Sequence, residues 1–179
     1  DIIYTEIKLF SDVEDHHEQL WSITKNVAWV INDKWMTPDK GIWEFRGEDQ
    51  HFTFSKVLCW VAIDRAIKVA ELFNKGKKIK KWILLRDSIK KDILSKGWNK
   101  NKRAFTQSYN SSDLDASVLL MEPYGFISAN DPKYISTVHA IEKELSNDGL
   151  LYRYKNEDDF GLPSSSFTVC TFNNESSAK

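Results

Sequence analysis

Apolar residues recur at spacings of three and four along most of this chain, as they do on one face of an α-helix. In the clearest stretch, residues 14–36, the inward positions would be Leu20, Thr24, Val27, Ile31 and Trp35. Pro38 ends this stretch, because proline cannot continue a helix. The same pattern recurs at about 55–73, 77–96 and 132–147. We therefore expect an all-α protein with antiparallel helix pairs and long loops.

Local signals mark several helix ends. Ser11 followed by Glu14 is the pattern of a capping box, and Asp131 followed by Pro132 is typical of a helix start. Ser111-Ser112-Asp113 predicts the N-cap of a short helix that runs through Leu120. Beyond these, the sequence predicts a short extended piece at 150–154, a loop at 156–166 and the first turns of a helix at 167–172.

Composition narrows the class of protein. The 179 residues suffice for one domain, so we expect a single domain over 1–179 whose polar tail, 173–179, is disordered or non-native. The 25 basic and 26 acidic residues nearly balance, which argues against a nucleic-acid partner. No apolar run reaches the roughly 18 residues of a spanning helix, so we expect no membrane partner and a cytoplasmic location.

The remaining chemistry-bearing residue types predict no metal site and no cofactor. His16-His17, His51 and His139 lack the spacing of metal ligands, and Asp113-Leu114-Asp115 lacks the rest of a calcium loop and is better interpreted as a helix cap. Cys59 and Cys170 both lie in apolar runs, so we expect them to pack as small buried side chains rather than to form a disulfide.

One acidic side chain has a neighbourhood suited to catalysis. Glu44 follows Trp43 in a glycine-flanked loop, Asp-Lys-Gly-Ile-Trp-Glu-Phe-Arg-Gly, at residues 39–47. A carboxyl group partly shielded by an aromatic ring has a raised pKa, which a general acid working near neutral pH requires. On this local pattern alone, a solvated surface carboxylate is the more frequent interpretation.

Five stretches in order resemble the catalytic domain of glycoside hydrolase family 15, whose members include glucoamylases, glucodextranases and prokaryotic trehalases. They lie at 38–47, 54–66, 105–109 together with 111–117, 149–154 and 166–172. The resemblance covers nearly the whole chain. It implies an (α/α)6 barrel, of which about half would be present, and an enzyme that inverts configuration at the anomeric carbon of an α-glucoside with two carboxyl groups.

The resemblance also implies roles for individual residues. Glu44 would be the general acid that protonates the leaving glycosidic oxygen. Ile42 and Trp43 would line the pocket for the non-reducing-end glucose, and Arg153 would bind sugar hydroxyls on both sides of the scissile bond. Asp158, within an acidic Glu-Asp-Asp loop, resembles an acidic residue that the family places near this arginine.

Two departures from the family pattern matter. Fungal glucoamylases carry a second Glu after the acid, whereas this chain has Phe45, as in the prokaryotic branch, which leaves trehalose or short gluco-oligosaccharides as substrates. The family also places its general base well beyond the stretch that ends at Phe172, and this chain has seven more residues. We therefore expect the chain to hold the acid, to lack the base and to be inactive alone.

Two other functions are compatible with a helical chain of this kind: a non-catalytic module whose paired helices bind a protein partner, and a different carbohydrate-active enzyme on an (α/α) barrel.

Half of a closed barrel would leave apolar helix flanks uncovered. We therefore expect homo-oligomers to form through the flanks of the helices at 14–36, 55–73 or 132–147.

Overall fold

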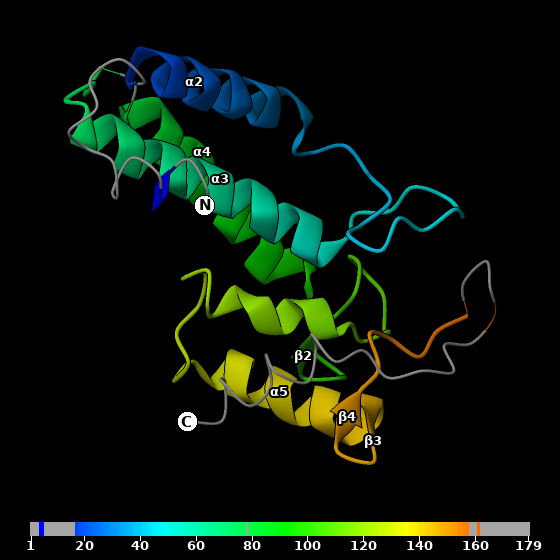
Figure 1. Cartoon of the computed structure of the whole chain (residues 1–179). Coiled ribbons are helices and arrows are strands. Elements are labelled where there is room, and N and C mark those ends of the chain that lie inside the picture. Colours follow the sequence, from blue (N-terminus) through cyan, green and yellow to red (C-terminus); the bar gives the residue numbers. More distant parts are fainter. Residues whose placement is uncertain (1–3, 6–16, 78, 158–160, 162–179) are drawn as a thin grey trace. The chain divides into compact units, whose positions relative to one another are not determined.

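The computed structural model describes residues 4–5, 17–77, 79–157 and 161 of the chain (Figure 1). Its main helices are α2 (His17–Lys34), α3 (Thr53–Leu72), α4 (Ile79–Lys96), the 3-10 helix η2 (Ala116–Met121) and α5 (Pro132–Leu145). Two short antiparallel pairs accompany them, β1 (Trp98–Asn99) with β2 (Ala104–Phe105) and β3 (Ser146–Asn147) with β4 (Leu150–Leu151). Helices dominate, as the sequence predicts.

Contacts group the described residues into two compact units. The first unit is drawn from residues 1–37 and 58–91, and the second from residues 38–57 and 92–179. Helices α3 and α4 each contribute residues to both units. The single domain predicted for 1–179 stays a prediction, and the tail at 173–179 lies outside the described residues.

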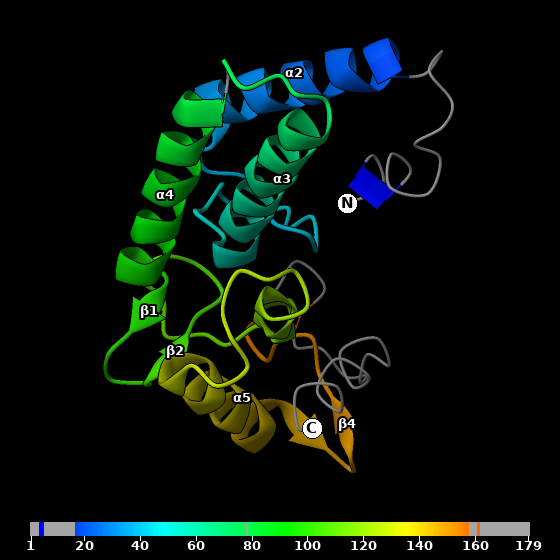
Figure 2. The same ribbon diagram turned by 90° about the vertical axis from the view of Figure 1, so that its left-hand side faces the viewer.

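In the first unit, α3 and α4 run antiparallel, and α2 lies against them (Figure 2). Aromatic rings make part of this contact. The Trp21 ring lies 5.7 Å from that of Trp82 in α4 and 6.5 Å from that of Phe73, measured between centroids. The expected inward face of α2 is partly wrong, because Val27 is 39% exposed while Ala28 is buried. Because Trp21 turns inward to meet these two rings, the buried face of α2 runs through Trp21, Thr24 and Ala28. Of the expected positions, Thr24 and Trp35 are buried.

The second unit is built around α5. The hydroxyl of Tyr134 donates to the Leu119 carbonyl of η2 at 2.8 Å, and the Phe105 N–H of β2 donates to Thr137 Oγ1 at 3.0 Å. The N-cap expected at Asp131 is confirmed, because its carboxylate accepts the Lys133 N–H at 2.8 Å. The helix therefore starts where the sequence places it and buries one face against η2 and β2.

Three expected boundaries need correction. The short helix after residue 111 is a 3-10 helix with Asp115 as its N-cap, two residues later than predicted. Helix α5 ends at Leu145 because Ser146–Asn147 pairs with β4, and the extended piece expected at 150–154 is a strand only over Leu150–Leu151. The capping box at residues 11–14, Cys170 and the helix expected at 167–172 lie outside the described residues.

Candidate active site

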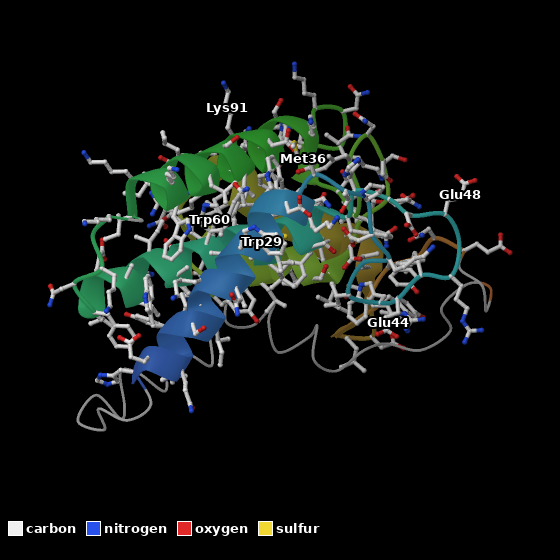
Figure 3. The ribbon with its side chains drawn as sticks, turned by 90° about the horizontal axis from the view of Figure 1, so that it is seen from above. Trp29, Met36, Glu44, Glu48, Trp60 and Lys91 are labelled. Carbon is white, nitrogen blue, oxygen red and sulfur yellow. The ribbon has the colours of Figure 1, made fainter. Side chains whose placement is uncertain are left out.

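The loop that carries Glu44 is closed at its base by two backbone hydrogen bonds. The N–H of Asp39 donates to the Gln50 carbonyl at 2.8 Å, and the N–H of Gln50 donates back to Asp39 at 2.9 Å. These two bonds close residues 40–49 into a single loop, which we call the acid loop (Figure 3, cyan). Its ends cannot separate without breaking both bonds.

The side chain of Asp39 anchors this loop to the start of α3. One carboxylate oxygen accepts the Gly41 N–H and the Ser55 hydroxyl, each at 2.7 Å. The other oxygen lies 3.1 Å from the Lys56 ammonium, which is 3% exposed. A buried ammonium needs a counter-charge, and the Asp39 carboxylate supplies one to Lys56. The same carboxylate also accepts hydrogen bonds from two uncharged donors.

Aromatic rings fill the space beneath the acid loop. The Phe45 ring stacks on Phe52, with centroids 5.1 Å apart, and contacts Tyr154 at 4.9 Å. Gly41 passes so close that a Cβ added there would lie 2.9 Å from Phe52 Cγ, and its φ is +69°. Both observations require glycine at position 41. Phe45, where fungal glucoamylases would carry a second Glu, therefore packs beneath the acid loop, against Phe52 and Tyr154.

Glu44 itself has an uncommon backbone. Its φ is +54°, in the left-handed region that side chains other than glycine, asparagine and aspartate rarely adopt. Such conformations cost free energy and concentrate at functional sites. The Glu44 side chain is exposed, so the expectation that Trp43 shields it from water is not met among the described residues (Figure 3).

Trp43 points the other way, into the unit. Its indole Nε1–H donates to Oδ2 of Asp115 at 2.9 Å, and the side-chain amide of Gln107 donates to the same oxygen at 3.2 Å. The other oxygen, Oδ1, accepts the Ser117 N–H at 2.8 Å. Asp115 is 3% exposed, and this burial raises the pKa of its carboxyl above the ordinary 3.8, although hydrogen bonds from Ser117, Gln107 and Trp43 oppose the rise.

Arg153 lies against the same tryptophan. Its guanidinium carbon is 6.0 Å from the Trp43 ring centroid and 4.8 Å from that of Tyr154. Its backbone carbonyl accepts the N–H of Ala116, the residue after Asp115, at 2.9 Å. A cation held over aromatic faces keeps its planar donors oriented, as recognition of paired hydroxyls requires.

The structure thus brings Trp43 and Arg153 together, 110 positions apart in the sequence, in the second unit. Ile42, like Glu44, is exposed at the turn of the acid loop, and Asp158 lies outside the described residues. Sequence reasoning assigned no role at this site to Asp115 beyond helix capping, and none to Gln107. The one available signal for Asp115 was an acidic residue between two buried apolar ones, Leu114 and Ala116.

The arrangement is suited to acid catalysis on a neutral, hydroxylated substrate. It offers one exposed carboxyl, one guanidinium and a fixed indole ring, and among the described residues no group of three His, Cys, Asp or Glu side chains is placed to hold a metal ion. Cys59, expected to be buried, is half-buried in α3. None of the described helices is long and apolar enough to cross a membrane.

Comparison with known proteins identifies the family. The sequence profile described as Glycosyl hydrolases family 15 matches residues 2–177. The chain belongs to this family. The match confirms the resemblance based on five sequence stretches, and it favours the glycosidase interpretation over a non-catalytic helical module.

Family 15 relatives of this chain include several trehalases. The trehalase of Mycolicibacterium smegmatis is 42% identical over 175 residues, which are 96% of this chain and 26% of that protein. The trehalase of Thermoplasma volcanium is 40% identical over 86% of this chain and 25% of its own length. The chain therefore spans about a quarter of the curated relatives it matches.

Solved glycosidase structures share the fold. A wild-type glycosidase superposes with a TM-score of 0.70 at 14% identity, over 91% of this chain and 48% of the solved chain. A glycosidase in complex with glucose gives the same TM-score over 90% of this chain and 47% of its own. The predicted fold class, all-α and part of an (α/α)6 toroid, is confirmed.

Proposed function

We propose that this chain supplies the general-acid half of an inverting glycosidase whose substrate is trehalose, with Glu44 as the acid. The 42% identity to a trehalase over nearly the whole chain carries the proposal. Two structural observations support it: the left-handed backbone at Glu44, and the placement of Arg153 beside Trp43. Phe45 also supports trehalose over starch, because its ring packs on Phe52 instead of reaching toward a second sugar.

In this mechanism the Glu44 carboxyl donates its proton to the glycosidic oxygen as the bond to the anomeric carbon breaks. A carboxylate on the opposite face of the sugar activates the attacking water, about 6.5–9.5 Å from the acid. By the family pattern, that base belongs to a part of the enzyme that these residues do not cover. Loss of a general base costs about 10²–10⁴ in rate, so the chain by itself is expected to be inactive.

The other predicted residues bind the substrate. Arg153 donates to sugar hydroxyls on both sides of the scissile bond, and Ile42 and Trp43 contact the non-reducing-end glucose. By the family pattern, Asp158, which lies outside the described residues, would accept from a substrate hydroxyl. These groups orient a neutral sugar by hydrogen bonds and ring contacts, so binding requires no metal or cofactor.

The test uses a hybrid trehalase, in which residues 2–177 replace the matching segment of the M. smegmatis enzyme. We expect the hybrid to hydrolyse trehalose and Glu44→Gln to lower kcat by about 10²–10⁴ with little change in KM, because only proton donation is lost. Glu48→Gln is the matched control, since Glu48 is exposed on the same loop and has no predicted role (Figure 3).

The stereochemistry of the products provides an independent check. Inversion of trehalose releases one β-glucose from the attacked ring and one α-glucose as leaving group, so fresh products observed by NMR should contain both in equal amounts. Release of α-glucose alone would show retention and contradict the mechanism. A folded hybrid that hydrolyses maltose but not trehalose would contradict the substrate while leaving the role of Glu44 intact.

A further inference from the structure

The buried carboxylate of Asp115 joins the two parts of the site that must act on one substrate. It belongs to the segment before η2, yet one of its oxygens accepts the indole N–H of Trp43, the residue before Glu44. The next residue, Ala116, donates its N–H to the backbone carbonyl of Arg153. Two consecutive residues therefore contact both the acid loop and the segment that carries the arginine.

The geometry of Asp115 leaves little freedom for the tryptophan. Trp43, Gln107 and the backbone of Ser117 donate to its two oxygens at 2.8 to 3.2 Å, and the residue is 3% exposed. An indole N–H can only donate, so the part-buried Trp43 N–H needs an acceptor. The hydrogen bond fixes the edge of the indole, and the Arg153 guanidinium lies 6.0 Å from its ring centroid. These two contacts hold the backbone that leads into Glu44 at a fixed position relative to Arg153.

We propose that Asp115 is a positioning residue for the reaction, which acts through Trp43 to fix the Glu44 backbone relative to Arg153. The proposal rests on the proposed function, because it takes Glu44 as the acid. It adds that Asp115 does not touch the substrate. Its effect on the rate comes from geometry, and a misplacement of about 1 Å in such a site can cost about 10² in rate.

A double-mutant cycle in the hybrid trehalase tests this role. In Asp115→Asn the amide offers a single acceptor oxygen, so either the Trp43 N–H or the Ser117 N–H loses its hydrogen bond to residue 115. In Trp43→Phe the indole donor is absent; the Asn oxygen can then accept from Ser117, while its NH₂ faces a rotated Gln107 carbonyl. We expect Asp115→Asn to lower kcat about 10–100-fold in the parent and less than about threefold in the Trp43→Phe background.

Asp113→Asn is the matched control, since Asp113 is an exposed aspartate two positions away whose carboxylate accepts only from Ser111 among the bonds described. Thermal unfolding of every variant separates positioning from stability. If Asp115 had only a structural role, Asp115→Asn would lower Tm but leave kcat per folded molecule unchanged. The effect of Asp115→Asn on kcat would then be the same in the parent and in the Trp43→Phe background. That result would overturn the proposal.

A second measurement applies even where a variant has low activity. The indole N–H resonance of Trp43, assigned by its absence in the ¹⁵N-labelled Trp43→Phe hybrid, should shift and exchange faster with solvent in Asp115→Asn. An unchanged resonance would overturn the proposal. Activity lost in Asp115→Asn but retained in Glu44→Gln would instead contradict Glu44 as the acid, whereas loss only in Glu44→Gln would contradict the role of Asp115 alone.

Discussion

Lys56 and Asp39 form an ion pair beneath the acid loop, with Nζ 3.1 Å from Oδ2. The lysine is 3% exposed, whereas the aspartate side chain is 35% exposed and also accepts from Gly41 and Ser55. The two partners are therefore unequal. Removing the carboxylate leaves a buried cation without this counter-charge, while removing the cation leaves a partly solvated carboxylate with two donors.

This inequality predicts different costs for the two substitutions. Asp39→Asn should lower the free energy of unfolding by about 3 kcal/mol, because the buried Lys56 ammonium loses the Asp39 counter-charge. Lys56→Met should cost less, about 1 kcal/mol, since it keeps the buried stem and removes the charge. Urea denaturation of the purified chain measures both. Asp49→Asn, at an exposed position of the acid loop, is the control, and equal costs for the two substitutions would contradict the interpretation.

The acid loop also depends on Gly41. Gly41→Ala should destabilise the protein by about 1–2 kcal/mol or more, because alanine pays for a left-handed φ and its Cβ meets the Phe52 ring. In the hybrid trehalase the displaced loop should lower kcat as well. Gly47→Ala is the control within the same loop, since a Cβ there meets nothing within 4 Å. Similar unfolding curves for the two variants would show that the loop adapts.

Sequence reasoning predicted the elements well where a local signal existed. The cap at Asp131 and the start of α5 depend on residues adjacent in the chain, so periodicity and capping patterns locate them. Val27 was misplaced because the rotation of α2 is set by the contact of Trp21 with Trp82, 61 positions away. No pattern within the helix encodes that contact.

The candidate site shows the same division. Glu44, Trp43 and Arg153 were found through motifs of a known family, whereas the hydrogen bond of Trp43 to Asp115 spans 72 positions and needs the fold to become visible. The left-handed backbone at Glu44 was equally hidden, because glutamate does not favour that conformation. Family motifs thus predict which residues act, and tertiary structure shows what holds them.

In the first unit, Asp64 predicts a specific pH dependence of stability. Burial alone would raise the pKa of its carboxyl, but the hydrogen bonds and charges of Lys68 and Arg65 outweigh burial and lower the pKa below 3.8. A lowered pKa stabilises the folded state at every pH above the pKa of the same carboxyl in the unfolded chain, about 3.8. This stabilisation is lost as the pH falls below 3.8 and through the pKa of the folded state. Asp64→Asn should therefore flatten the loss of stability in acid.

Urea midpoints measured between pH 2.5 and 6 test this expectation. At pH 6, Asp64→Asn should cost about 1–3 kcal/mol, because charged hydrogen bonds to Arg65 and Lys68, at 2.7 and 2.9 Å, are weakened. Asp87→Asn is the control, since this exposed carboxylate pairs with Arg86, as Asp64 does. Parallel pH curves for the parent and Asp64→Asn would contradict the lowered pKa.

The last prediction concerns the outer face of α2. Ile23, Val27 and Val30 follow a helical spacing and are 46%, 39% and 48% exposed, and Trp29 beside them is 69% exposed (Figure 3). Full burial of one such aliphatic side chain contributes about 1.5–3 kcal/mol, so covering three half-exposed ones favours association by several kcal/mol before its entropic cost. We expect the chain to self-associate through this face at high concentration. The double substitution Ile23→Lys and Val30→Lys should raise the dissociation constant of the self-association at least about tenfold, as measured by sedimentation velocity.

Leu84→Lys, at a 71% exposed position of α4, controls for the added charge. A parent chain that stays monomeric at hundreds of micromolar would contradict self-association through α2.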